Sequence, residues 1–321
     1  MLDGSWVVVT GGAGFLGSWL CERLLVDGAR VVCIDSLVTG SRANLHAAHG
    51  RDRFRFVEAD VCDGLPVDEP VDVIFHLASA ASPLHYLQLP LETLRVGSVG
   101  TTAALDLAER TGARFVLAST SEVYGDPLEH PQHESYWGNV NPVGPRSVYD
   151  EAKRFAEATT AAYRRHRGVD TAIARIFNTY GPRMAIDDGR VVPTFVRQAL
   201  EGEPLTVAGD GSQTRSLCWV DDTVDGLVRL AESPDAGPVN IGGDAELSVL
   251  DIARTIIEMT GSSSTIEFVP LPEDDPRVRQ PDLTEAEGLL GWRPRTPLRE
   301  GLTRTIEWMA RHVAERDRLP A

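Results

Sequence analysis

Short apolar runs alternate along the first half of the chain with longer stretches in which apolar residues recur at helical spacing. The short runs are rich in β-branched and aromatic residues and have the length of buried strands. They span 6–10, 30–34, 54–58, 71–76, 114–118 and 171–176. Helices are predicted between them, most clearly at 101–111 and 148–166. Strands that alternate with helices of this length predict an α/β fold built on a doubly wound parallel sheet.

After about Asn178 the pattern changes to shorter elements that are interrupted by prolines. A helix at 221–232 and a strand at 238–241 are expected to return to the sheet, whereas helices at 249–260 and 300–311 lie outside it. We therefore predict a sheet domain formed by 1–177 with 214–245. The smaller C-terminal lobe would comprise 178–213 with 246–321, and the cleft between the two would hold the ligands.

Three glycines follow the first predicted strand at G-x-x-G-x-x-G spacing, namely Gly11, Gly14 and Gly17. Without side chains, the backbone can approach a pyrophosphate at the positive N-terminus of the following helix. Asp35, at the tip of the second strand, would accept the ribose hydroxyls and repel a 2′-phosphate, which favours NAD over NADP. Arg42 could soften that preference.

A tyrosine and a lysine stand one helical turn apart, at Tyr149 and Lys153. An ammonium beside a phenol stabilises the phenolate, so the pair predicts a general acid and base. Lys153 is also the only lysine in the chain, which otherwise uses arginine. Upstream, the Thr120 hydroxyl could orient a substrate oxygen or, alternatively, cap its own backbone.

The overall charge narrows the possible partners. A formal net charge of -16 argues against nucleic acid and anionic membranes, because the field repels phosphate. An anionic substrate would need a local cluster of arginines. No apolar run approaches the length of a membrane span, and four scattered cysteines without a CxxC pair suggest a reducing, cytoplasmic location and no metal site.

Together, the glycine motif, the Tyr149–Lys153 pair and Thr120 resemble the extended short-chain dehydrogenase/reductase superfamily of sugar-nucleotide enzymes. That superfamily has a Rossmann-type sheet with a smaller C-terminal substrate lobe. A closer resemblance is to the UDP-glucuronate decarboxylases, also called UDP-xylose synthases. It is carried by the segments STSEVYGDP, YWGNVNPVGPRSVYDEAKR, ARIFNTYGPRM, GDGSQTRS and DDPRVRQPDL and covers nearly the whole chain.

The resemblance implies that the enzyme oxidises UDP-glucuronate at C4 with NAD, releases CO2 from the 4-keto sugar and forms UDP-xylose, or releases the UDP-4-keto-pentose. It also implies a homodimer. The catalytic residues would be Thr120, Ser121, Glu122, Tyr149, Lys153 and Arg279. The substrate would contact Asn178, Arg183, Val191, Arg215 and Arg279. The cofactor would contact Gly11, Gly14, Phe15, Leu16, Asp35, Ser36, Thr39, Gly40, Asp60, Val61, Leu77, Ser79, Tyr149, Lys153, Thr179 and Arg190.

Several alternatives stay open at this point. Asp60 could accept the adenine amine or simply cap a helix. Gly97 stands where the family often has asparagine, which bears on contacts beside the nicotinamide. The enzyme could instead be a UDP-glucuronate 4-epimerase or a sugar-nucleotide 4,6-dehydratase, and more remotely the chain could be a dinucleotide sensor without catalytic activity.

Overall fold

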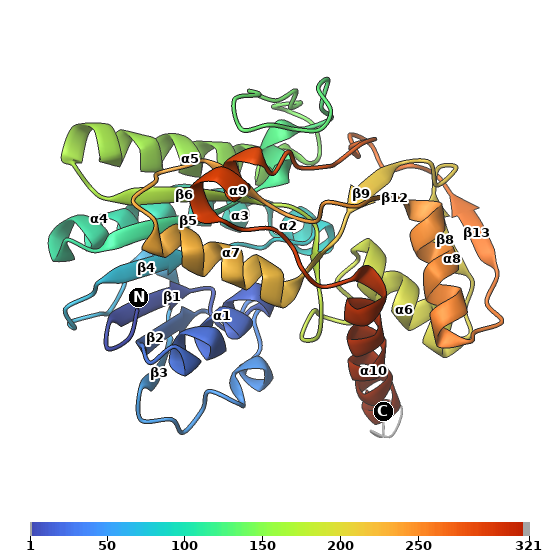
Figure 1. Ribbon diagram of the computed structural model, residues 1–321, viewed down its shortest axis with the longest axis horizontal. Coiled ribbons are helices and arrows are strands. Elements are labelled where there is room, and N and C mark those ends of the chain that lie inside the picture. The colour runs from blue at the N-terminus through green and yellow to red at the C-terminus, as the bar shows by residue number, and fades with distance from the viewer. Residues whose placement is uncertain (1, 317–321) are drawn as a thin grey trace.

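A seven-stranded parallel sheet lies at the centre of the computed structural model, which describes residues 2–316 (Figure 1). The strands follow the order β11-β6-β5-β4-β1-β2-β3. From β1, the strands up to β3 are added on one side and those from β4 onward on the other, so the strand order reverses between β1 and β4. They are β1 (Trp6–Thr10), β2 (Arg30–Asp35), β3 (Phe54–Glu58), β4 (Val73–His76), β5 (Arg114–Thr120), β6 (Thr171–Ile176) and β11 (Val239–Ile241). Ligands bind at such a reversal, outside the carboxyl ends of the strands.

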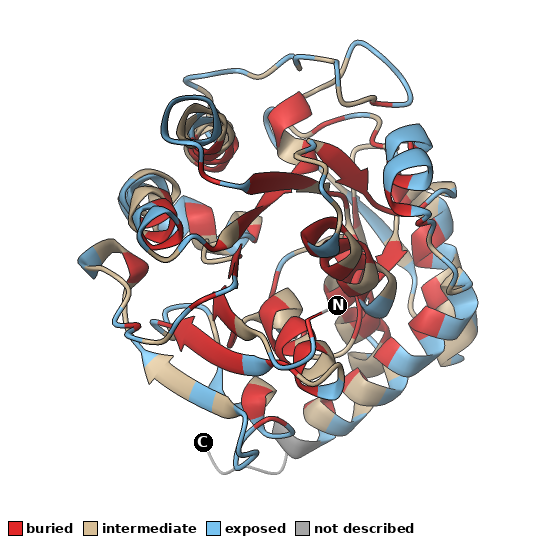
Figure 2. Ribbon diagram, turned by 60° about the vertical axis from the view of Figure 1, so that its left-hand side comes forward, coloured by how far each residue is buried: buried red, intermediate tan, exposed pale blue. Residues whose placement is uncertain are grey.

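Helices cover both faces of this sheet. On one face, α1 (Phe15–Val26) and α7 (Val220–Glu232) share a core with the strands; on the other, α4 (Thr101–Thr111) and α5 (Ser147–Arg167) do so. The strands are largely buried except for the edge strand β3, and the helices are buried on their inward faces (Figure 2). The predicted doubly wound fold is therefore confirmed.

A second core joins the elements beyond the sheet. Its helices are α6 (Val191–Glu201), α8 (Val249–Thr260) and α10 (Leu298–Arg316). Three strand pairs accompany them: β8 (Leu205–Ala208) with β13 (Ile266–Val269), β9 (Thr214–Ser216) with β12 (Glu246–Ser248), and β7 (Thr179–Tyr180) with β10 (Cys218–Trp219). The helix α9 (Thr284–Leu290) packs against the core of the sheet instead. The division into a sheet domain of 1–177 with 214–245 and a lobe of 178–213 with 246–321 stays a prediction.

One long helical segment runs from the cleft to the sheet. Only its last part, at 101–111, was predicted from the sequence. The segment begins with α2 (Pro83–Gln88), which Ser82 caps by accepting from the His85 backbone N–H. It continues through α3 (Pro90–Arg95) and a π-helical turn (Val96–Gly100) into α4. A Cβ on Gly97 would lie 2.7 Å from the Cβ of Ala152, so glycine lets this turn pack directly on α5 between Tyr149 and Lys153.

Within residues 2–316, no helix has the length and apolar character that a membrane crossing requires. In the same part of the chain, no group of histidine, cysteine and acidic side chains is arranged to hold a metal ion.

Candidate active site

A cavity of about 1260 Å³ extends from the carboxyl ends of β1 and β2 to the second core. Every residue predicted to bind cofactor or substrate, or to act in catalysis, lines it, except Gly40. A Cβ on Gly40 would lie 2.8 Å from a carboxylate oxygen of Asp35. Gly40 therefore supports the site by leaving room for Asp35 rather than by facing the cavity.

The glycine turn places the N-terminus of α1 at the cavity. Gly14 is the N-cap, and no side chain accepts from the free N–H groups of the first turn. Gly11 has a φ of 70°, and a Cβ there would clash with the backbone of Ala78; a Cβ on Gly17 would lie 2.2 Å from the carbonyl of Gly11. Gly11 and Gly17 make the tight turn possible, while the N–H groups beyond Gly14 stay available for an anion, which fits a pyrophosphate.

Asp35 ends β2 with its carboxylate held by the backbone. It accepts from the N–H of Ala13 at 2.9 Å and of Leu37 at 2.8 Å. Burial raises its pKa, whereas these bonds lower it. Arg42 forms an ion pair with Glu58 and lies over the ring of Phe56. Its guanidinium is thus engaged away from Asp35.

Asp60 caps the short helix that follows β3. One of its oxygens accepts from the Cys62 N–H at 2.8 Å, and the other lies 3.7 Å from Arg95. The capping alternative is therefore confirmed, although Asp60 and Val61 also line the cavity.

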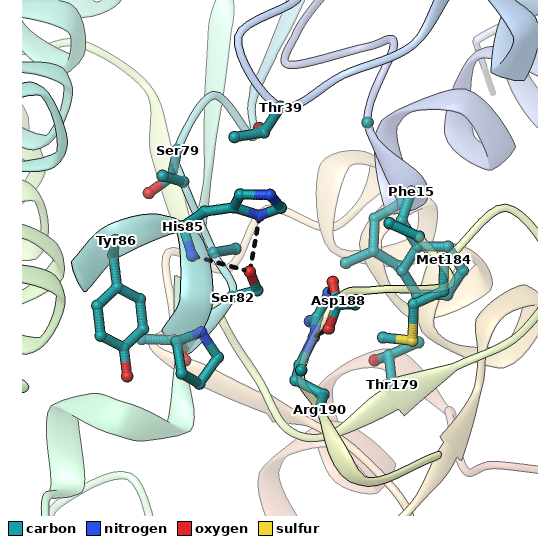
Figure 3. Close-up of a pocket in the computed structure, with 18 of the residues that line it drawn as sticks. Phe15, Thr39, Ser79, Ser82, His85, Tyr86, Thr179, Met184, Asp188 and Arg190 are labelled. Carbon is teal, nitrogen blue, oxygen red and sulfur yellow. Dashed lines mark hydrogen bonds and ion pairs between the residues drawn. The ribbon is translucent and has the colours of Figure 1, made fainter. Parts of the chain in front are cut away.

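Two groups of side chains face each other across the middle of the cavity (Figure 3). Thr39, Ser79 and the hydrogen-bonded pair Ser82–His85 lie on one side, with a 2.7 Å contact between the Ser82 hydroxyl and His85 Nδ1. Opposite lie Phe15, Thr179, Met184, Asp188 and Arg190. Arg190 forms a bidentate ion pair with Asp188, so its charge is already compensated in part.

Tyr149 and Lys153 lie on the first turns of α5, and both are buried. The Tyr149 ring stacks on Tyr86 with 5.1 Å between centroids. The Lys153 ammonium donates to the carbonyl of Ala118 at 2.8 Å and lies 5.9 Å from the centre of the Tyr149 ring. β5 thus fixes the ammonium beside the phenol.

The expected lowering of the phenol's pKa by Lys153 is not what the structure shows. Burial, reinforced by the charge of Glu122, raises the pKa of Tyr149 to about 12, while Thr120 opposes this shift through a hydrogen bond to the phenol. Burial also lowers the pKa of Lys153 to about 8. Desolvation thus dominates the pKa shifts of both groups. Thr120 additionally accepts from the Glu122 N–H at 3.2 Å, so it caps its own turn as well.

Beside Tyr149 lies a buried cluster of charged side chains, which we call the arginine cluster: Glu122, Arg146, Arg215, Asp275 and Arg279. Arg279 forms a two-pronged fork with Glu122, with N–O distances of 2.8 and 2.7 Å, and Arg146 reaches the same carboxylate at 2.9 Å. Asp275 accepts from Arg215 at 2.8 Å and lies 3.4 Å from Arg146. The two arginines hold the pKa of Glu122 at about 2 despite its burial, so it is ionised at neutral pH.

Arg279 thus forms its fork with a carboxylate of the protein, and its predicted contact with the substrate stays a prediction. Among the other predicted substrate contacts, Asn178 has a buried side-chain oxygen without a hydrogen-bond partner. Arg183 is 2.7 Å from Glu22 and lies over the ring of Trp19. Val191 starts α6, and Ser121 is buried at the end of β5; both face the cavity.

Comparison with known proteins decides the family. Residues 7–242 match the NAD dependent epimerase/dehydratase family. The chain belongs to this family. It is 53% identical to UDP-glucuronic acid decarboxylase 4 of Arabidopsis thaliana over 296 residues. The aligned region covers 92% of this chain and 66% of that protein. It is 49% identical over 311 residues to UDP-glucuronic acid decarboxylase 1 of Danio rerio, covering 97% and 74%. The chain thus spans about two thirds to three quarters of the length of these relatives.

Solved structures agree with this family assignment. The UDP-glucuronic acid 4-epimerase of Bacillus cereus, in complex with UDP-glucuronic acid and NAD, matches with a TM-score of 0.83 at 29% identity, over 96% of this chain and 99% of the epimerase. For a member of the epimerase/dehydratase family, the free N-terminus of α1 and the buried Asp35 fit NAD. The fit rests on uncapped N–H groups at one end and a carboxylate facing the cavity at the other.

Several residues that the structure places in or beside the site were not predicted from the sequence. Arg146, Asp150 and Asp275 line the site or the cavity behind it, and Tyr86 and His85 come from the unpredicted α2. Arg146 stands one turn before Asp150 in the YDEAK segment, so its position relative to Tyr149 was a usable signal. Nothing in the local sequence distinguishes Asp275 from its neighbours Glu273 and Asp274.

Proposed function

We propose that this protein decarboxylates UDP-glucuronate with NAD and yields UDP-xylose. The decarboxylases among its relatives support the proposal, and so does one observation on the site. An arginine cluster with excess positive charge lies directly beside the buried tyrosine that would act on the sugar. A sugar carboxylate needs such a counter-charge in a protein that is otherwise strongly acidic.

Tyr149 would take the proton of the C4 hydroxyl, which Thr120 orients. The positive charge of Lys153 would stabilise the phenolate that forms. NAD, when bound, would supply the hydride acceptor for oxidation at C4 and the hydride donor for the final reduction of the same carbon. Oxidation would place a ketone β to the carboxylate, and the ketone would accept the electron pair that is left when CO2 departs from C5. The resulting enolate would take up a proton at C5 before C4 is reduced.

The arginine cluster would hold the carboxylate so that its bond to the ring aligns with the ketone. The planar guanidinium of Arg279 can shift part of its fork from Glu122 to the substrate, while Arg146 retains Glu122. Ser121 and Glu122 would lie near C5 and C6. Arg183 and Arg215 would contribute local positive charge for the diphosphate or the carboxylate, and Arg190 would contact the cofactor.

We further propose that the protein forms a homodimer through α5 and the helices that pack on it. Apolar side chains are exposed on this face of the molecule: Leu87, Leu91, Leu94, Val99 and Phe155. A second copy would cover them, as expected for a patch of this kind. Light scattering should give twice the mass of the chain, and Phe155→Glu should shift it to one chain. The reducing, cytoplasmic location stays a prediction from the sequence.

The deciding experiment is to incubate the protein with UDP-glucuronate and NAD, and to measure CO2 and identify the nucleotide sugar. CO2 together with UDP-xylose or the UDP-4-keto-pentose supports the proposal. An epimerised uronate without CO2 would indicate a 4-epimerase, and no uronate turnover but dehydration of a nucleotide hexose would indicate a 4,6-dehydratase. Binding of NAD without any turnover would favour the sensor. Tyr149→Phe serves as the inactive control.

A further inference from the structure

A second cavity, of about 390 Å³, lies behind the arginine cluster. Arg146 and Asp275 line both this cavity and the larger one, so they form the wall between the two. Asp150 lines the second cavity, and only 6% of the residue is exposed. One of its oxygens has no hydrogen-bond partner. A buried carboxyl oxygen without a hydrogen-bond partner destabilises the fold when the carboxyl is ionised, so its presence here calls for an explanation.

Asp150 is placed to act on the arginine cluster through Arg146. The two residues are one helical turn apart at the start of α5, and both line the second cavity. The charged and titratable groups around Asp150 come from several elements of the fold. They are Glu122, Arg146, Tyr86, Tyr149, Glu151, Asp126, Asp274, Asp275, Arg277 and Arg279.

The charge of the arginine cluster depends on this carboxyl. Arg146, Arg215 and Arg279 supply three positive charges, and Glu122 and Asp275 supply two negative charges. One positive charge remains, which matches the single charge of a sugar carboxylate. An ionised Asp150 would cancel it. The pKa of Arg215 is lowered to about 10 by burial and by the positive charges of Arg279 and Arg146, which agrees with an excess of positive charge here.

We propose that Asp150 is a positioning residue whose protonated carboxyl leaves the arginine cluster with one positive charge for the substrate carboxylate. Binding of a uronate above neutral pH would then take up one proton at Asp150, and water in the second cavity would supply it. This rests on the proposed function in one respect, namely that the ligand is a uronate. Burial and the negative charge of Glu122 raise the pKa of Asp150 to about 7, so its protonation changes near neutral pH.

The test measures binding in a Tyr149→Phe background, where turnover is blocked, with NAD present and between pH 6.5 and 8.5. Two ligands are compared: UDP-glucuronate, and UDP-glucose, which carries a neutral hydroxymethyl group in place of the carboxylate. The Kd of UDP-glucuronate should rise at least fivefold over this range, since the limit for one coupled proton is about tenfold per pH unit. The Kd of UDP-glucose should change little. Lys153 titrates in the same range, but it would face C4 in both ligands. Its effect on the pH dependence of Kd is therefore the same for both and cancels in the comparison.

Adding Asp150→Asn should abolish the pH dependence and hold the Kd of UDP-glucuronate near its value at pH 6.5, because asparagine is a permanently neutral isostere. Glu151→Gln is the matched control on the same helical turn; it is partly exposed and should keep the pH dependence. Calorimetry in two buffers of different ionisation enthalpy should detect proton uptake in the parent and none with Asp150→Asn.

Two results would overturn the proposal: a pH dependence that persists with Asp150→Asn, or equal pH dependence for both ligands in the parent protein. The second result requires no Asp150 variant to fold. Failure of the proposed function shows separately, as an absence of CO2 from the wild-type enzyme.

Discussion

Replacing Arg279 by lysine tests the proposed role of the arginine cluster in decarboxylation. Arg279 is 5% exposed, and both of its terminal nitrogens are bonded to Glu122. Lysine keeps the positive charge but has a single ammonium in place of the planar fork. Oxidation at C4 requires only Tyr149, Lys153 and NAD in register. Release of CO2 also requires the carboxylate to be held at a defined angle to the ketone.

The size of the effect follows from the bonds that are lost. One of the two charge-assisted bonds disappears, and such a bond contributes about 1.5–3 kcal/mol. Arg146 remains 2.9 Å from Glu122, so the carboxylate is not left unpaired and the larger penalty for breaking a buried ion pair should be avoided. We therefore expect CO2 release to slow by about 10- to 100-fold relative to hydride transfer.

The assay follows NADH absorbance and CO2 release in one sample after addition of UDP-glucuronate. Arg279→Lys should accumulate NADH, because the ketone forms faster than it is consumed. Arg293→Lys, an exposed arginine paired with Glu287, is the control and should behave as the wild type. If NADH formation and CO2 release fall in proportion, Arg279 only binds substrate. If neither changes, the fork with Glu122 is purely structural.

The remaining predictions concern single residues. Tyr149→Phe should lower kcat by at least about 10²-fold with an unchanged fold by circular dichroism, because the acid and base is removed; near-normal turnover would contradict the assignment. Asp35→Ala should raise the Kd of NAD and reduce the preference over NADP, measured by fluorescence titration, and an unchanged ratio would show that Asp35 does not contact the ribose. Because burial lowers the pKa of Lys153 to about 8, its charge is present below pH 8 and lost above it, so kcat should fall on that side and Lys153→Arg should extend activity to higher pH. Asp150 keeps its proton in the folded protein up to about pH 7, whereas in the unfolded chain it loses the proton near pH 4, so folding is penalised as pH rises between these values. Asp150→Asn should therefore raise the free energy of unfolding at pH 8 by roughly 4 kcal/mol at most, with no gain at pH 4, and equal changes at both pH values in urea titrations would refute it.

The sheet and the cofactor end of the site were largely predictable, because their signals are local. The apolar runs at 54–58 and 171–176 gave strands with the same bounds in the structure, as did the helix at 101–111. Gly11, Gly14 and Asp35 act through the turn and strand that they belong to. Helices α2 and α3 were missed since each is only six residues long and carries no complete helical repeat. A prediction from periodicity needs at least two turns.

The sugar end could be predicted only in part, because its partners are distant in sequence. Glu122 and Arg279 are 157 residues apart, and only the folded chain shows that they form a fork. The same holds for Arg215 and Asp275, which lie in a region of the sequence with several equivalent arginines and acidic residues. Family resemblance indicated that Glu122 and Arg279 matter, yet it did not show that each is the other's partner.

Two buried carboxylates illustrate what the three-dimensional arrangement adds to the sequence. Asp35 is the last residue of β2, Glu122 closely follows β5, and both line the same cavity. Neutral backbone N–H groups hold Asp35, and burial still raises its pKa; two guanidinium groups hold Glu122 and lower its pKa to about 2. A carboxylate with neutral donors is suited to accept hydroxyl groups, as a ribose presents. A carboxylate that binds two arginines instead keeps those cations in place for another anion. The two ends of one cavity therefore select different ligand chemistry with the same functional group, and the difference lies in which donors the fold brings to each.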